Sequence, residues 1–449
     1  MCEIKNAGYK DTALRLLQSA NCQIGDNICI TCKSKTYEGI LIPRAEYGDT
    51  TNIIIIKMKN GYNVGIAVSK GVNIEKIGVG TKPMHTTPTL PEQNSALPRV
   101  IIMITDGTIA GHVNYQTGTT TCSTISANDL YGVAPELSEI AQIDTENVFN
   151  TYSENITPKN WTKLAKKIAK HIKHGTDGIV ITHSTDTMSY TSAALSFALQ
   201  NLPIPIIFVG AQYPSDRPSS DATTNLIAAV KTAGEAPFAE VSLATHETIS
   251  DSTIAIHRGV RARKCHTSRR DAFKSVNDFP IAKVLDQKII IEKNEYQQRD
   301  PSKQLVLKPN FCEKVALIKL YPSIDPSIID YYVNQGFKGI LLEGYGLGHV
   351  NTTCFKAIKN ATAKGVIVAL ASQCIWGRVN MNINDTGRTL LNLGVVALED
   401  MFPETGLVKL MWALGQTSDT KKATQLLKTN IVGEFTIRSL PQKETGYGA

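Results

Sequence analysis

Three short segments of this sequence contain the side-chain types that a nucleophilic reaction needs. The first is Thr105-Asp-Gly-Thr108, which follows the β-branched stretch 100–104. That stretch is typical of a buried parallel strand, which is apolar on both faces. Reactive groups gather at the carboxyl ends of such strands, so a threonine here is a candidate nucleophile, and Gly111 and Gly118 predict a movable loop after it. An ordinary strand-to-loop turn explains the same residues.

The second segment is His183-Ser-Thr-Asp-Thr187, which follows the apolar stretch 178–182. A hydroxyl directly followed by a carboxylate, as in Thr185-Asp186, can pass a proton to or from a nucleophile. Helix capping is the alternative, because Ser, Thr and Asp are all good N-caps for the helical residues that follow.

The third segment is rich in arginine and contains one lysine, Lys264. Five arginines accompany it within the thirteen residues Arg258 to Arg270. Neighbouring cations favour the neutral amine of a lysine, whereas a carboxylate such as Asp186 favours the ammonium, so the sequence leaves the protonation state open. An RNA-contacting patch and a solvated basic loop are the alternatives.

An α/β architecture accounts for the spacing of these segments. Apolar strand-like stretches alternate with helical ones from residue 99 onward, which favours a doubly wound, mostly parallel sheet domain over 99–310. The same alternation resumes after a polar connection and predicts a smaller C-terminal α/β domain over 311–449. The expected strands are 100–104, 178–182, 204–209, 241–245, 315–320, 339–343 and 366–371.

The first part of the chain follows a different pattern. Residues 1–80 contain short strand-like runs separated by glycine turns, which predicts a small β-barrel. Residues 81–98 contain four prolines among polar residues, so we expect a linker there.

Composition narrows the class of protein. The 449 residues carry 47 Lys plus Arg against 40 Asp plus Glu, a net charge of +7, which permits nucleic-acid contact without arguing for it. Nine cysteines are scattered, and we expect free thiols and no metal site, even for the pair Cys29 and Cys32. No apolar run approaches the length of a membrane span, so we expect a cytoplasmic protein without membrane contact.

Taken together, the three segments resemble the L-asparaginase/glutaminase family of amidohydrolases. Thr105-Asp-Gly-Thr108 is similar to the family's Thr-Gly-Gly-Thr element, with Thr108 in the place of the nucleophile. Thr185 and Asp186 match the family's Thr-Asp pair. Lys264 matches the lysine that completes the proton relay.

The same resemblance implies roles for further residues. Tyr115 falls in the place of the lid tyrosine, and Ser153 with Glu154 resembles a substrate-binding pair. Ser184 lies beside the Thr-Asp pair, among the substrate-binding residues, and Gly107 lies in the turn that would help to hold the oxyanion.

Several stretches narrow the resemblance to the D subunits of archaeal glutamyl-tRNA(Gln) amidotransferases, and the N-terminal β module is one of them. The others are Glu343-Gly-Tyr-Gly-Leu-Gly-His349, Ser372-Gln-Cys-Ile-Trp-Gly-Arg-Val-Asn-Met-Asn382 and Glu399-Asp-Met-Phe-Pro-Glu-Thr405. Simple asparaginases lack both the β module and the stretch around Trp376.

This narrower resemblance implies a glutaminase that works for a partner. Such a protein hydrolyses glutamine and passes ammonia to an E subunit, which activates Glu-tRNA(Gln) with ATP and magnesium, so that the complex is a ligase. It further implies a homodimer of this chain, tRNA(Gln) bound mainly through the partner, and no cofactor on this chain.

Two residues depart from the family pattern, because Asp106 and Ser184 stand where the family has glycine. Glycine permits positive φ and close approach of the backbone to a substrate. These two residues keep open the alternative of a catalytically silent scaffold subunit. Independently of them, a stand-alone L-asparaginase that acts without a partner is a second alternative.

Overall fold

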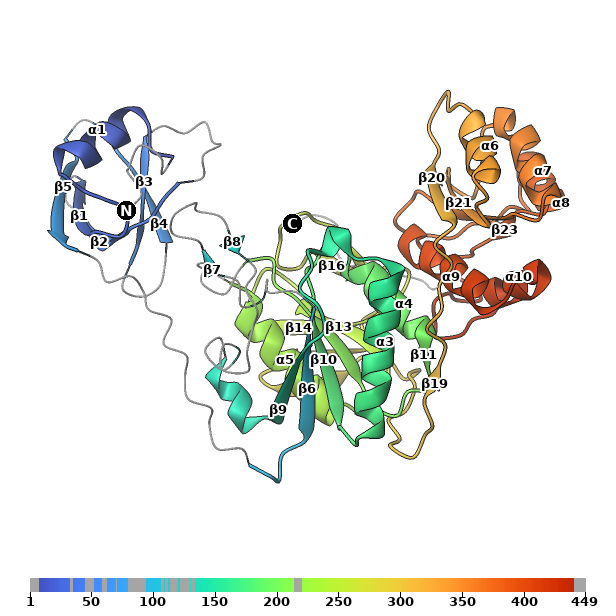
Figure 1. The fold of residues 1–449 in the computed structure, drawn as a ribbon, viewed down its shortest axis with the longest axis horizontal. Coiled ribbons are helices and arrows are strands. Elements are labelled where there is room, and N and C mark those ends of the chain that lie inside the picture. The colour runs from blue at the N-terminus through green and yellow to red at the C-terminus, as the bar shows by residue number, and fades with distance from the viewer. Residues whose placement is uncertain are drawn as a thin grey trace.

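The computed structural model describes most of the chain (Figure 1). The described residues are 8–32, 35–44, 52–58, 63–69, 71–79, 94–105, 109, 112–113, 120–121, 130, 134–213 and 220–439. Asp106, Gly107, Thr108 and Tyr115 lie outside them, so the predictions made for these four residues stay predictions. No helix in the described part is both long and apolar enough to span a membrane.

An eight-stranded mixed sheet forms the centre of the larger α/β domain, with the order β18-β17-β14-β13-β12-β10-β6-β9. Its parallel strands are β9 (Gln142–Asn147), β6 (Arg99–Ile104), β10 (Gly178–Thr182), β12 (Ile206–Val209) and β13 (Val241–His246). Its antiparallel strands are β14 (Thr253–Arg258), β17 (Ala282–Leu285) and β18 (Lys288–Ile291). The predicted parallel sheet is therefore present and is extended by an antiparallel part.

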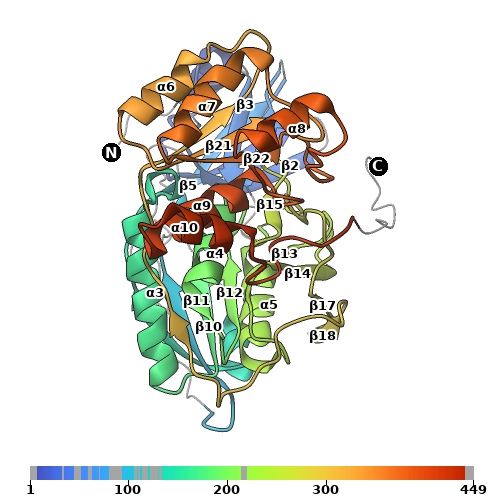
Figure 2. The ribbon, with the colours of Figure 1, turned by 90° about the vertical axis from the view of Figure 1, so that its right-hand side faces the viewer.

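Helices cover both faces of this sheet (Figure 2). Along β6, Ile101 and Met103 pack with residues of α3 (Pro158–Lys173) and α4 (Met188–Ala198). Val100 and Ile102 face the other way and pack with α5 (Ala222–Glu235). The alternation follows from the two-residue period of a strand, and burial of both faces explains why β6 is apolar from Val100 to Ile104.

The C-terminal domain is a second, smaller parallel sheet with helices. The strand order is β20-β21-β22-β23, with β20 (Val315–Lys319), β21 (Gly339–Gly344), β22 (Ile367–Ser372) and β23 (Val396–Ala397). Its helices are α6 (Ser327–Asn334), α7 (Phe355–Ala363), α8 (Asp385–Asn392), α9 (Pro403–Gln416) and α10 (Thr420–Lys428). Short two-stranded pairs complete the described strands: β7 (His112–Val113) with β8 (Thr120–Thr121), β11 (Leu199–Gln200) with β19 (Val306–Leu307), and β15 (Ala262–Lys264) with β16 (Phe273–Ser275).

The N-terminal module differs from the predicted β-barrel. It is an antiparallel sheet with the order β4-β3-β2-β1-β5, and within the described ranges its edge strands do not pair with each other, so no closed barrel forms. A helix covers the apolar face instead, since Ala13 and Leu17 of that helix share a buried cluster with Ile28 and Ile54 of the sheet. The elements are α1 (Asp11–Ser19), β1 (Asn27–Cys32), β2 (Lys35–Leu41), β3 (Ile53–Lys57), β4 (Asn63–Ala67) and β5 (Asn73–Gly78).

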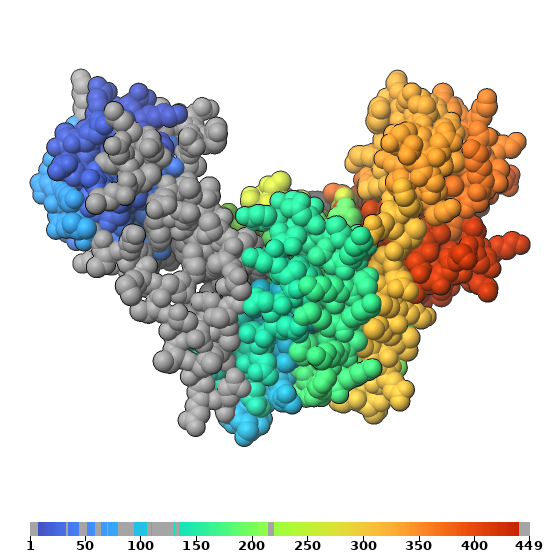
Figure 3. Space-filling view, in the orientation of Figure 1, coloured from blue at the N-terminus to red at the C-terminus, as the bar shows by residue number. Residues whose placement is uncertain are grey.

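The two α/β domains share an apolar interface, and their surfaces meet directly in Figure 3. Helix α4 of the larger domain packs against α9 of the smaller one, with the rings of Phe197 and Trp412 stacked at 5.8 Å between centroids. The indole nitrogen of Trp412 donates to the carbonyl of Lys308 at 3.1 Å. A buried aromatic pair of this kind fixes how the domains dock, because it removes a large apolar area from water.

A fully buried ion pair lies next to this interface. Neither Lys409, on α9, nor Glu434, in the chain after α10, has an exposed side chain. The Glu434 carboxylate also accepts from the backbone N–H groups of Ile431 and Val432, and Lys409 donates to the carbonyl of Thr429. Burial lowers the pKa of Lys409, and Glu434 opposes that shift.

We predict that Glu434→Ala destabilises the protein by about 3–5 kcal/mol, because it leaves a buried ammonium without its counter-charge. The measurement is the midpoint of urea unfolding. The double variant Lys409→Met/Glu434→Gln is the control, since it removes the buried charge and keeps an acceptor for the two N–H groups. The double variant should recover most of the loss, and equal destabilisation by both would contradict the electrostatic explanation.

Candidate active site

The carboxyl ends of β6 and β10 are joined at Thr105. Its backbone N–H and its hydroxyl both donate to the carbonyl of Thr182, the hydroxyl at 2.6 Å. Thr105 is fully buried. A buried hydroxyl engaged in this way is not available as a nucleophile, which supports Thr108 as the candidate within that motif.

The predicted lysine and the predicted Thr-Asp pair are in direct contact. Lys264 ends β15, and its Nζ donates to Thr185 Oγ1 and to Asp186 Oδ1, both at 2.7 Å. Thr185 is buried and the Lys264 side chain is 14% exposed, whereas the Asp186 side chain is 73% exposed. An amine between a hydroxyl and a carboxylate, with one side open to solvent, is suited to moving a proton to and from a reacting group.

The predicted substrate-binding segment lies beside this contact. Ser153 is buried in a short 3-10 helix, Ser153–Asn155, while Glu154 is exposed. The carbonyl of Ser153 accepts from the hydroxyl of Thr187 at 2.8 Å. The structure therefore brings together three segments that are far apart in the sequence, around residues 153, 185 and 264.

A buried histidine orients the turn that carries Thr185. The Nδ1 of His183 lies 2.6 Å from the carbonyl oxygen of Ser184, and its Nε2 lies 2.9 Å from Thr191 Oγ1. A carbonyl can only accept, so Nδ1 carries the proton, and the Nε2 of a neutral imidazole then accepts from Thr191. The indole N–H of Trp161 donates to that same hydroxyl. His183 is thus a packing and positioning group next to the predicted oxyanion region.

The arginines around Lys264 are paired with carboxylates inside the protein. Neutralised in this way, they hold the lysine-bearing segment in place and do not form a free basic patch. The pairs are Arg258 with Glu240 and Asp278, Arg261 with Asp400, Arg263 with Glu404, Arg269 with Asp271, and Arg270 with Asp251.

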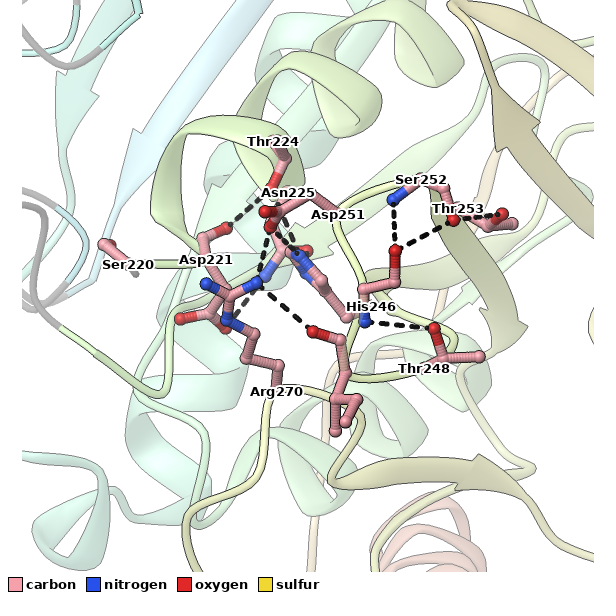
Figure 4. Close-up of polar contacts among 12 residues, drawn as sticks. Ser220, Asp221, Thr224, Asn225, His246, Thr248, Asp251, Ser252, Thr253 and Arg270 are labelled. Atoms are coloured by element: carbon pink, nitrogen blue, oxygen red, sulfur yellow. Dashed lines mark hydrogen bonds and ion pairs between the residues drawn. The ribbon is translucent and has the colours of Figure 1, made fainter. Parts of the chain in front are cut away.

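Figure 4 shows how the end of this segment is connected to helix α5. Arg270 donates to Asp251 Oδ1 at 2.6 Å, and the same oxygen lies 3.1 Å from the Nε2 of buried His246. The Nδ1 of His246 lies 2.8 Å from Asn225 Oδ1, and Asn225 donates to Asp221 Oδ2 at 3.2 Å. A continuous polar network therefore links the turn after Lys264 to the beginning of α5.

Sequence patterns gave no indication of this network or of the arginine pairs. Apart from Arg269 and Asp271, the paired arginines and carboxylates come from separate segments of the chain, and their spacing follows no helix or strand period. The Arg270–Asp251 pair, for example, joins two loops that follow different strands. The one available signal was the density of arginines near Lys264, which a basic loop explained equally well.

Profiles of three protein families match this chain. The profile described as asparaginase, N-terminal, matches residues 99–297, and the glutaminase/asparaginase C-terminal domain profile matches residues 314–427. The GatD N-terminal domain profile matches residues 22–77, within the module that precedes the catalytic domain.

Relatives extend the match to nearly the whole chain. The D subunit of glutamyl-tRNA(Gln) amidotransferase from Metallosphaera sedula is 43% identical over 434 residues, which cover 96% of this chain and 97% of that protein. The protein of the same name from Pyrococcus furiosus is 45% identical over 410 residues, covering 90% and 92%. This chain belongs to the family of glutamyl-tRNA(Gln) amidotransferase D subunits.

Solved structures of L-asparaginases are similar in fold to this chain. The thermostable L-asparaginase from Thermococcus kodakarensis is 31% identical, with a TM-score of 0.68 over 75% of this chain and 99% of that chain. L-asparaginase I from Vibrio cholerae is 29% identical, with a TM-score of 0.66 over 76% and 100%. These enzymes cover about three quarters of the chain, whereas the D-subunit relatives cover nearly all of it.

A third buried histidine, after His183 and His246, supports the hairpin that carries Lys264 and generates a pH prediction. His257, on β14, contacts Ser275 Oγ of β16 through Nδ1 at 2.8 Å. Burial, with a smaller contribution from Lys274, lowers its pKa from 6.5 to about 3. Between these two values the unfolded chain binds a proton here that the folded chain does not, so stability is lost as the pH falls.

We predict that this histidine costs the folded state about 1.4 kcal/mol for each pH unit below 6, until the pH nears its lowered pKa. The test compares urea midpoints of the wild type and His257→Asn between pH 7 and pH 4. The wild-type midpoint should fall more steeply, because Asn does not titrate. Parallel curves for the two proteins would show that His257 is not responsible.

Proposed function

We propose that this chain is the glutaminase subunit of a glutamyl-tRNA(Gln) amidotransferase. It hydrolyses glutamine and supplies ammonia to a partner protein, which uses the ammonia to convert Glu-tRNA(Gln) to Gln-tRNA(Gln). The observation that carries the proposal is the contact of Lys264 with Thr185 and Asp186 at 2.7 Å, in a chain whose relatives over 96% of its length are D subunits of such enzymes.

The proposed reaction begins at Thr108. Its Oγ attacks the carbonyl carbon of the glutamine side-chain amide and gives its proton to the relay of Thr185, Asp186 and Lys264. Backbone N–H groups near Gly107 and Ser184 stabilise the negative charge on the former carbonyl oxygen. The C–N bond then breaks, and the departing nitrogen takes a proton from the relay and leaves as ammonia.

Water completes the cycle. It attacks the ester carbon that joins Thr108 to the γ-glutamyl group, a proton returns to Thr108 Oγ, and glutamate is released. In this proposal Ser153, Glu154 and Ser184 help to hold the glutamine, and Tyr115 closes over it from the lid. The buried position of Ser153 beside Thr187 supports the first of these roles.

The assembly in which this takes place is part of the proposal. The partner is the E subunit, which holds tRNA(Gln) and uses ATP and magnesium, so this chain needs no cofactor or metal of its own. We further propose a homodimer of this chain and a cytoplasmic location. Free glutamine hydrolysis is wasteful, which favours a lid that closes productively only when the partner and tRNA are present.

We predict that Thr108→Ala abolishes glutamine-dependent formation of Gln-tRNA(Gln) by the complex and leaves ammonia-dependent formation intact. The physical reason is that the variant removes only the nucleophile, while the partner still receives ammonia from solution. Amidation is measured with glutamine or with an ammonium salt as the nitrogen source. If glutamine-dependent amidation persists, Thr108 is not the nucleophile.

Substitutions of Asp106 and Ser184 test whether the chain is a catalytically silent scaffold. We predict that the wild-type chain in its complex already hydrolyses glutamine, and that Asp106→Gly/Ser184→Gly keeps or raises that rate, because glycine lets a substrate approach the backbone more closely. Ammonia release is measured from glutamine and from asparagine. No release from glutamine by either protein would favour the scaffold, and rapid release from asparagine without the partner would favour an asparaginase.

A further inference from the structure

The hairpin that carries Lys264 is fastened at its base to the C-terminal domain. Arg261, which is 1% exposed, lies 3.3 Å from Asp400 Oδ2 and donates to the carbonyl of Gly433 at 3.0 Å. Arg263 Nε forms an ion pair with Glu404 Oε1 at 3.0 Å. Arg261 directly precedes strand β15 and Arg263 lies within it, so the C-terminal domain holds the strand that ends in the lysine.

A third contact holds the other strand of the same hairpin. Asn277 follows β16, and its side-chain nitrogen donates to the carbonyls of Gly377 and Asp400, each at 2.9 Å. Its side-chain oxygen accepts from the backbone N–H of Gly377 at 2.7 Å. Asn277 thus makes three hydrogen bonds to the C-terminal domain, and all of them go to backbone groups.

The backbone of Asn277 is as constrained as its side chain. Its φ is +54°, in the left-handed region that asparagine tolerates better than most residues. Gly377 and Asp400 belong to two of the stretches that narrow the resemblance to the D subunits, 372–382 and 399–405. Those stretches therefore meet at the base of the lysine hairpin, although neither touches Lys264 in the contacts described.

We propose that Asn277 is a positioning residue for Lys264, because it fixes the base of the lysine hairpin to the C-terminal domain through Gly377 and Asp400. The inference rests on the proposed function, in which the lysine takes part in proton transfer. Lys264 Nζ has to stay within hydrogen-bond distance of both Thr185 and Asp186, and a displacement of about 1 Å can lower a rate by about 100-fold.

The test uses two variants with complementary properties. Asn277→Gly keeps the positive φ without strain and removes the three hydrogen bonds. Asn277→Asp keeps the size and the acceptor, but it places a carboxylate oxygen against two carbonyl oxygens. We expect kcat for glutamine hydrolysis by the complex to fall by about 10- to 100-fold in both, while KM for glutamine changes little.

The chain offers a matched control in Asn201. It also has positive φ, +56°, and its side chain makes a comparable hydrogen bond to the carbonyl of Gln304, within the larger domain. Asn201→Gly should leave kcat unchanged. Thermal unfolding midpoints of all three variants separate a loss of positioning from a loss of folding.

The outcomes distinguish this inference from the proposed function. If both Asn277 variants keep kcat within about twofold of the wild type, or lower only the unfolding midpoint, Asn277 has a structural role alone and the inference is wrong. Lys264→Ala is measured in parallel. Loss of hydrolysis in Lys264→Ala combined with normal Asn277 variants overturns only this inference, whereas full activity of Lys264→Ala overturns the proposed relay and the inference with it.

Discussion

The contact of Lys264 Nζ with the Thr185 hydroxyl and the Asp186 carboxylate depends on how the surrounding fold holds two separate segments together. Thr185 and Asp186 follow the central parallel strand β10, while Lys264 arrives on an antiparallel hairpin from a different part of the chain. Both donor–acceptor distances are 2.7 Å, so neither element can shift by much without breaking the contact. The antiparallel extension of the sheet and the docked C-terminal domain both serve to hold that hairpin.

Several charged side chains of this protein are paired in its interior. The arginines near Lys264 each face a carboxylate, and Lys409 and Glu434 pair without any exposure. Buried pairs of this kind contribute little net stability relative to apolar packing, but breaking one is costly, so they fix a particular arrangement of the chain. Two of these pairs, Arg261–Asp400 and Arg263–Glu404, join the two α/β domains at the lysine hairpin.

Strands and site residues could be predicted from the sequence where an apolar stretch is directly followed by reactive side chains. The apolar strand 178–182 and the Thr185-Asp186 pair after it could be predicted because burial and polarity change sharply at that point. The open N-terminal sheet could not be predicted, because short strands with glycine turns fit a barrel equally well and only packing reveals that α1 covers the apolar face. The Asn277–Gly377 contact could not be predicted either, because hydrogen bonds to backbone groups far along the chain produce no periodic pattern in the sequence.

The contacts that fix the lysine hairpin to the C-terminal domain form late in the synthesis of the chain. Gly377, Asp400, Glu404 and Gly433 all follow Lys264 far along the chain. Domains generally fold from the N-terminus onward as a chain leaves the ribosome. A growing chain therefore carries its lysine well before the residues that fix the hairpin have been made. A chain that stops before these residues lacks the contacts, and under the proposed role of Asn277 it hydrolyses glutamine more slowly than the full chain.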